Sequence, residues 1–325
     1  MRKKALLIGI NNYPNGNELY GCVNDAKELS SILERNGDYS KNFDTKCLLD
    51  VSSTSKAKQA IEELFKGDDD CALLYFSGHG FINSTGGEIV FPDNCTSDSC
   101  YKGLEMSTIM QIANRSKVKN KIIILDCCHA GNIAENINSA NSELREGVSI
   151  LTACRKDETA LEMGGHGVFT ELLCDALRGG ASDFSGNITI GGIYAYIDRS
   201  FGCWEQRPVF KTNVCEFSPL RTVSPKVAND VIRELTNLFN SAGEEFFLDP
   251  SFEDTNAPKI EHKIIEPFAN PDHVKQFKLL QKLQSIGFVE PVGEEFMYFA
   301  AMNSKSCRLT ALGQYYWRLV TNNRI

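Results

Sequence analysis

The sequence lacks any apolar run long enough to cross a membrane, which needs about 18 or more such residues. Its first residues are basic, but the apolar stretch that follows, Ala5 to Ile10, is short and is broken by Gly9. This pattern does not fit a signal peptide. We therefore expect the stretch to be a first β-strand, and the chain to work in the cytoplasm without contacting a membrane.

Two further absences narrow the class of function. The formal net charge is −8, so the chain lacks the basic excess of most nucleic-acid-binding proteins, and nucleic acid is not expected as its main partner. The 12 cysteines include no Cys-x-x-Cys pair, which argues against a structural zinc site. Several cysteines lie within expected strands or helices, so we expect reduced thiols in a cytosol-like compartment.

Up to about residue 215, short apolar runs alternate with amphipathic stretches of helical length. The strand-like runs are residues 4–10, 43–50, 71–77, 121–128, 147–153 and 207–212. The helical stretches are residues 22–36, 57–64, 106–113, 169–177 and 190–200. Strands that are apolar on both faces and separated by helices predict an α/β domain over residues 1–221, with a mainly parallel sheet covered by helices on both faces.

From about Pro225 the pattern changes. A helix is expected at 226–240, an irregular acidic stretch at 241–270, a helix at 274–286, strand-like runs at 288–292 and 295–302, and a final helix at 309–320. This order predicts a smaller α+β, winged-helix-like accessory domain over residues 222–325.

Reactive side chains follow the third and fourth strand-like runs, at the edge where parallel sheets bind ligands. His79 lies between two glycines after the third run, and Asp126, Cys127 and Cys128 end the fourth. Neighbouring parallel strands lie about 4.8 Å apart, so His79 can serve as general base for a cysteine of the next strand. Gly80 leaves room for a backbone N–H that, with the N–H of Cys128, can bind an oxyanion.

The motifs YFSGHG and LDCCHAG resemble the two signatures of the caspase and metacaspase group of cysteine proteases. Three further runs, LLIGINNYPNGNELYGCVNDA, ILTACRKDETALE and GHGVFTELLCDAL, are similar to other metacaspase segments, so the resemblance covers about residues 1–215. In the second signature the nucleophile is the cysteine two residues after the aspartate. Counted from Asp126 this is Cys128, so the resemblance implies a dyad of His79 and Cys128. Cys127 stays a minor alternative as the nucleophile.

The resemblance also implies a substrate pocket. Asp25 and Asp126 correspond to metacaspase positions that line the pocket for the residue before the cut, and Ser77 and Cys22 match further pocket positions. Two carboxylates there favour an arginine or lysine side chain through charge-assisted hydrogen bonds. Structural alternatives remain, because Asp25 near a helix start also complements the helix dipole and Asp126 can orient the active-site backbone.

Two family traits bear on activation. Many metacaspases need calcium, but the loop after His79 holds only Glu88, Asp93 and Asp98, so we expect no cofactor and keep calcium as an open alternative. Family members often cut themselves between their two halves. Arg145 is the only basic residue of the polar segment 132–150, which predicts self-cleavage after Arg145.

Together these features predict a monomeric cysteine endopeptidase that cleaves proteins or peptides after Arg or Lys, with a C-terminal domain that binds a regulatory protein. By analogy with bacterial caspase-like proteins, a role in cell death or antiviral defence is the accompanying hypothesis. Two alternatives stay open: a caspase-like sensor or adaptor whose C-terminal domain binds protein or DNA, and a Cys-His enzyme of acyl transfer or ester hydrolysis.

Overall fold

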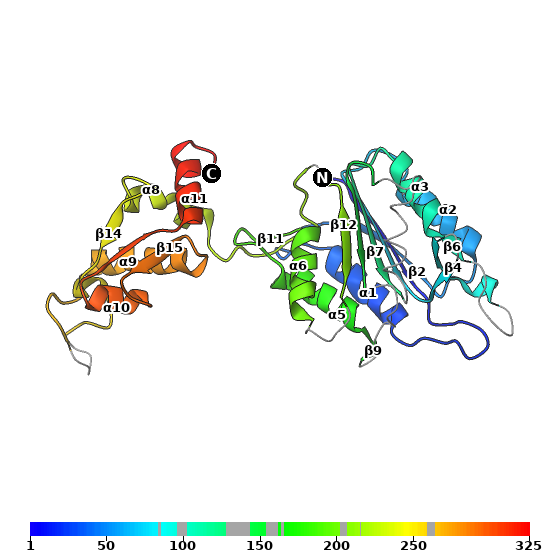
Figure 1. Cartoon of the computed structure of the whole chain (residues 1–325), viewed down its shortest axis with the longest axis horizontal. Helices are drawn as coiled ribbons and strands as arrows, with labels where there is room; N and C mark the ends of the chain where they lie inside the picture. Colours follow the sequence, from blue (N-terminus) through cyan, green and yellow to red (C-terminus); the bar gives the residue numbers. More distant parts are fainter. Residues whose placement is uncertain are drawn as a thin grey trace. The chain divides into compact units, whose positions relative to one another are not determined.

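The computed structural model describes residues 1–83, 86–95, 103–127, 144–153, 162–163, 166–201, 207–214, 216–258 and 264–325. The chain divides into two compact units, Met1–Ser224 and Pro225–Ile325, compared with an expected boundary after residue 221 (Figure 1). In these residues no helix is long and apolar enough to cross a membrane.

The larger unit is built on a six-stranded sheet with the strand order β12-β8-β7-β3-β1-β2. The strands are β1 (Lys3–Gly9), β2 (Asp44–Leu49), β3 (Cys71–Ser77), β7 (Asn120–Asp126), β8 (Val148–Thr152) and β12 (Val209–Thr212). All neighbours pair in parallel except β12, which runs antiparallel to β8 at one edge. The mainly parallel sheet expected from the sequence is confirmed.

Helices cover both faces of this sheet (Figure 1). The helices α2 (Thr54–Leu64) and α3 (Met106–Arg115) lie on one face, and α1 (Cys22–Leu33), α5 (Val168–Asp175) and α6 (Ile190–Ser200) lie on the other. Successive side chains of a strand point to opposite faces. On β3, Leu74 and Phe76 therefore pack with α2 and α3, whereas Leu73 and Tyr75 pack with α1 and α5.

The segment after β3 is not the continuous loop that the sequence indicated. Strands β4 (Gly80–Asn83), β5 (Gly86–Ile89) and β6 (Leu104–Glu105) form a small antiparallel sheet there. The remaining short elements of this unit are η1 (Pro92–Asn94), β9 (Glu162–Met163), β10 (His166–Gly167), η3 (Ala176–Gly180), β11 (Asn187–Ile188) and β13 (Arg221–Thr222). The small sheet begins directly after His79 and so ties down one side of that turn.

Most described cysteines are free thiols: Cys22, Cys47, Cys71, Cys127, Cys174 and Cys307. Burial raises the pKa of Cys71 to about 12 and that of Cys174 to about 12, so both thiols stay protonated at neutral pH. Cys95 is disulfide-bonded, which departs from the expectation of reduced thiols throughout.

The smaller unit is α+β, with an antiparallel sheet in the order β14-β16-β15. Its elements are α7 (Asn229–Arg233), α8 (Leu235–Leu238), β14 (Glu245–Phe247), η4 (Pro250–Phe252), α9 (Pro271–Ser285), β15 (Val289–Val292), α10 (Met297–Met302), β16 (Ser306–Leu309) and α11 (Ala311–Thr321). The stretch 241–270 is thus not wholly irregular, because it contains β14.

The second strand-like run, residues 295–302, was wrongly assigned, because most of it forms α10. Met297, Ala300 and Ala301 are buried, which is the i, i+3, i+4 spacing of a helix face. The two runs therefore do not pair with each other, and β15 instead pairs with β16, which follows α10.

Candidate active site

Three strand ends of the larger unit meet at one level. Gly9 of β1 is paired with Ser77 of β3, and Ser77 is paired with Asp126 of β7. The chain reaches His79 two residues after Ser77, and Cys128 two residues after Asp126. Cys128 lies outside the described residues. The register therefore establishes that the segments leading to His79 and Cys128 leave the sheet from neighbouring strands, about 4.8 Å apart.

His79 is held through its backbone and its ring. Its N–H donates to the Tyr13 hydroxyl at 3.0 Å, its carbonyl accepts from the Val90 N–H at 2.9 Å, and its Nε2 lies 2.8 Å from the Asn17 carbonyl oxygen. A carbonyl only accepts, so this contact assigns the hydrogen to Nε2. Nδ1 is then the ring nitrogen that can take a proton from a nucleophile.

The loop that presents the Asn17 carbonyl is braced by polar contacts. Oδ1 of Asp50 accepts the backbone N–H groups of Asn11 and Asn12 at 2.8 and 2.9 Å. The Asn11 side chain in turn accepts the Val23 N–H, at the start of α1, at 3.1 Å. The loop is therefore tied both to the end of β2 and to α1, which fixes the carbonyl against His79.

The Cys127 side chain points to the face of the sheet that α2 and α3 cover. It is 1% exposed and packs in the core beneath α2 and α3, together with Leu125. Asp126 lies between them in sequence and, by strand alternation, points to the opposite face. Burial in that core argues against Cys127 as the nucleophile, the alternative that the sequence left open.

Two carboxylates from different elements converge on Gly167. The Gly167 N–H donates to Oδ2 of Asp25 at 3.2 Å. A Cβ at Gly167 would lie 2.6 Å from Oδ2 of Asp126 and 3.4 Å from Oδ2 of Asp25, so only glycine fits there. Asp25 is 1% exposed and Asp126 is 5% exposed. We call Asp25 and Asp126 the acidic pair.

Hydroxyl groups complete the surroundings of Asp126. The Thr170 hydroxyl donates to Oδ2 of Asp126 at 2.7 Å and lies 2.6 Å from the Tyr75 hydroxyl. Burial, and then the charges of Asp126 and Asp25, raise the pKa of Tyr75 well above its ordinary value, so Tyr75 stays protonated and donates to Thr170. Neither Thr170 nor Tyr75 was found from the sequence. Both lie inside the motifs YFSGHG and GHGVFTELLCDAL, which was the one available signal.

The two other residues that the sequence assigned to a substrate pocket also lie at the carboxyl ends of the strands. Ser77 is the last residue of β3 and is 2% exposed, and Cys22 begins α1 with 5% exposure. Gly80 begins β4 and pairs with Ile89 of β5. The structure thus brings the sequence-derived residues together, except Arg145 and the undescribed Cys128.

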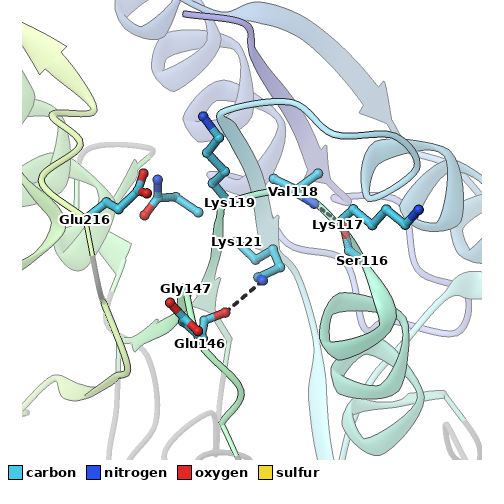
Figure 2. Close-up of a pocket in the computed structure, with 9 residues that line it drawn as sticks. Ser116, Lys117, Val118, Lys119, Lys121, Glu146, Gly147 and Glu216 are labelled. Atoms are coloured by element: carbon cyan, nitrogen blue, oxygen red, sulfur yellow. Dashed lines mark hydrogen bonds between the residues drawn. The ribbon is translucent and has the colours of Figure 1, made fainter.

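Arg145 lies at the amino-terminal ends of the parallel strands, whereas His79 follows a carboxyl-terminal end. It is exposed and comes three residues before β8, and its N–H is 3.3 Å from Oδ1 of Asn114. A pocket of about 270 Å³ lies beside it, lined by residues 116–121, 146–147 and 216. Figure 2 shows the Lys121 ammonium pointing to the Glu146 carbonyl, which it contacts at 2.8 Å. This pocket is therefore at the amino-terminal ends of the strands, away from His79.

The acidic residues considered for calcium contact protein groups instead. Glu88 is 2% exposed and accepts the Gly103 N–H at 2.5 Å, and Asp93 accepts the N–H and hydroxyl of Thr54 at 2.9 and 2.6 Å. Asp98 lies outside the described residues. Among those described, no group of three or more His, Cys, Asp or Glu residues is arranged to hold a metal ion.

A histidine and a cysteine that follow adjacent strand ends of a parallel sheet are the arrangement expected of a thiol hydrolase. Comparison with known proteins gives the family, because residues 2–216 match the caspase domain. The chain belongs to this caspase-domain family of cysteine peptidases.

Several metacaspases are similar to the chain. Metacaspase-6 of Arabidopsis thaliana is 28% identical over 285 residues, which cover 80% of this chain and 74% of that protein. Metacaspase-4 of the same plant is 32% identical, over 45% of this chain and 37% of that protein. Metacaspase-1 of Meyerozyma guilliermondii is 38% identical, over 25% and 22% respectively, so the match spans well under half of the last two relatives.

Among solved structures, caspase-1 of Spodoptera frugiperda matches with a TM-score of 0.47 and 14% identity, covering 68% of this chain and 90% of that one.

Proposed function

We propose that this protein is a cysteine endopeptidase that cleaves after arginine or lysine. The Cys128 sulfur attacks the scissile carbonyl, and Nδ1 of His79 takes the thiol proton and returns it to the leaving amine. The N–H groups of Gly80 and Cys128 stabilise the oxyanion. The orientation of His79, with Nε2 against the Asn17 carbonyl at the strand end beside Asp126, is the observation that carries this proposal.

The acidic pair supports the proposed specificity. Asp25 and Asp126 come from different elements and both lie against Gly167, next to the edge that carries His79. A guanidinium or ammonium group is the natural partner for two carboxylates in a buried site. Entry of such a side chain requires Gly167 to shift, and Ser77 and Cys22 would line the same pocket.

A panel of fluorogenic peptides ending in Arg, Lys or Asp tests the proposal. We expect turnover of the Arg and Lys peptides and none of the Asp peptide, because two carboxylates repel an acidic side chain. Esters with the same side chains, measured in parallel, address the acyl-transfer alternative. Absence of turnover for every peptide, with and without calcium, would defeat the protease proposal.

We expect peptide cleavage to be unchanged by a calcium chelator. Glu88 and Asp93 are engaged by backbone and hydroxyl donors, and calcium requires several oxygen ligands directed at one point. Initial rates with a chelator are compared with rates in about 1 mM calcium. Activity that disappears in the chelator and returns with added calcium would contradict this expectation.

We expect self-cleavage after Arg145 to occur between molecules. Arg145 lies at the amino edge of the sheet, and the seven-residue strand β7 separates that edge from His79, a span of roughly 20 Å. One chain cannot bring both together without unfolding its own sheet. The initial rate of processing should therefore rise with the square of the enzyme concentration.

The matched substrates for this experiment are the Cys128→Ala chain, which wild-type enzyme should cut, and Cys128→Ala with Arg145→Gln, which it should leave intact. A first-order processing rate that is independent of concentration would show cleavage within one chain. A wild-type chain that stays intact after long incubation would show that the protein does not cleave itself.

For the smaller unit we propose binding to a regulatory protein, with the enzyme otherwise acting as a monomer. Phe296, Tyr298 and Phe299 are 53%, 39% and 46% exposed and contact one another at the start of α10. Exposed aromatic clusters of this kind are typical of protein-binding surfaces. A part in cell death or defence remains a hypothesis by family analogy.

A further inference from the structure

Tyr13 lies in the loop after β1 and packs directly against His79. Its side chain is 2% exposed, and its ring centroid lies 4.5 Å from that of the imidazole, with the planes tilted by 59°. The phenol oxygen is 3.0 Å from the His79 nitrogen and 3.1 Å from the Val90 carbonyl oxygen. The phenol thus accepts the His79 N–H and donates to Val90.

These contacts close a ring of hydrogen bonds around the turn. The Val90 N–H donates to the His79 carbonyl at 2.9 Å, so Tyr13 joins the two backbone segments that flank the histidine. With its N–H, carbonyl and ring face all in contact, His79 has little freedom to rotate away from the Asn17 carbonyl.

The glycine before His79 is explained by the same phenol. A Cβ at Gly78 would lie 2.5 Å from the Tyr13 hydroxyl oxygen and 2.9 Å from the Phe76 ring. The space that a side chain at position 78 needs is therefore filled by Tyr13. This steric reason accounts for one glycine of the SGHG turn that the proton-transfer chemistry does not require.

We propose that Tyr13 is the positioning residue of His79, orienting the imidazole so that Nε2 meets the Asn17 carbonyl and Nδ1 is available to the nucleophile. The inference rests on the proposed function and adds a residue that acts through its contacts with His79. Burial raises the pKa of the Tyr13 phenol far above its ordinary value. The phenol therefore stays protonated, and its two hydrogen bonds persist, at every pH at which the enzyme works.

Tyr13→Phe keeps the ring and removes the hydroxyl. We expect kcat for the best Arg peptide to fall about tenfold with KM within about twofold of wild type, because proton transfer is sensitive to small misplacements. The pH profile for alkylation of Cys128 by iodoacetamide, followed by mass spectrometry, should move to higher pH, because a poorly aligned imidazole stabilises the thiolate less.

Ser149→Ala is the matched control. Ser149 is 1% exposed, and its hydroxyl bonds that of Thr212 at 2.7 Å, in the part of the sheet away from His79. Both variants remove one buried hydroxyl, so both should lower the Tm, and only Tyr13→Phe should change kcat and the alkylation profile. Equal kcat losses in the two variants, or a Tyr13→Phe enzyme identical to wild type, would overturn the inference.

The alkylation measurement distinguishes failure of this inference from failure of the proposed function. If wild type cleaves no peptide, the protease proposal fails, but the Cys128 alkylation rate still reports whether His79 activates the thiol. His79→Ala is measured beside Tyr13→Phe for this purpose. Slow alkylation in His79→Ala together with a wild-type profile in Tyr13→Phe would support the dyad of His79 and Cys128 and would show that Tyr13 does not position His79.

Discussion

Cys128→Ala is expected to lower peptide cleavage by about 1000-fold or more, whereas Cys127→Ala keeps activity within a few-fold of wild type. Cys128 follows Asp126 by two residues at the strand end next to the one that leads to His79. Cys127 instead packs in the core under α2 and α3 with 1% exposure. We therefore expect the adjacent thiols to have separate roles, a chemical one for Cys128 and a structural one for Cys127.

The two variants are compared with the peptide panel and by thermal unfolding. Cys127→Ala removes a buried sulfur from the core and should destabilise the chain by about 1 kcal/mol without changing KM. Cys128→Ala should lose turnover while its Tm stays close to that of wild type. Loss of activity with Cys127→Ala alone, at an unchanged Tm, would reassign the nucleophile to Cys127 and refute the counting of the motif from Asp126.

Neutralising the acidic pair should give the second large effect. Asp126→Asn is expected to lower kcat/KM for the Arg peptide about 100-fold, because a buried charge-assisted contact to the guanidinium is lost. The asparagine oxygen can still accept the Thr170 hydroxyl that Asp126 accepts at 2.7 Å. Asp25→Asn should act in the same direction, since Asp25 also lies against Gly167.

Asp183→Asn is the control for this pair, because Asp183 is exposed and its carboxylate accepts only local N–H groups of Asn187 among the described contacts. It changes the net charge by the same amount and should leave kcat/KM unaltered. The ratio of Arg to uncharged peptides is the decisive measurement. An equal fall for charged and uncharged peptides would mean that Asp126 supports the backbone rather than binding the basic side chain.

Local sequence patterns were sufficient to predict most strands and helices of the larger unit. Runs such as 71–77 and 121–128 are apolar on both faces, as is typical of strands in a parallel sheet that helices cover on both sides. The same patterns failed where two signals compete. Residues 295–302 are rich in aromatics, which favour strands, yet Met297, Ala300 and Ala301 bury a helical face. The small sheet β4–β6 was missed because its Gly-rich strands carry little periodicity.

The sequence also could not predict which residues far apart in the chain lie close together in the fold. Arg145 was chosen for its charge in a polar segment, and only the strand directions show that it lies at the edge away from His79. Tyr13 and Thr170 lie inside runs that resemble metacaspase segments, but nothing in those runs marks them as site residues. Their hydrogen bonds to His79 and Asp126 arise from packing between separate elements.

The sequence by itself determined the alternation of strands and helices, the motif residues His79 and Cys128, and the presence of two acidic candidates, because these depend on neighbouring residues. The tertiary structure alone decided that Asp25 and Asp126 meet at Gly167 and that Cys127 is buried beneath the helices. It also decided that the Tyr13 phenol occupies the space beside Gly78. These outcomes depend on strand register and helix packing, which join residues far apart in the chain and leave no local pattern in it.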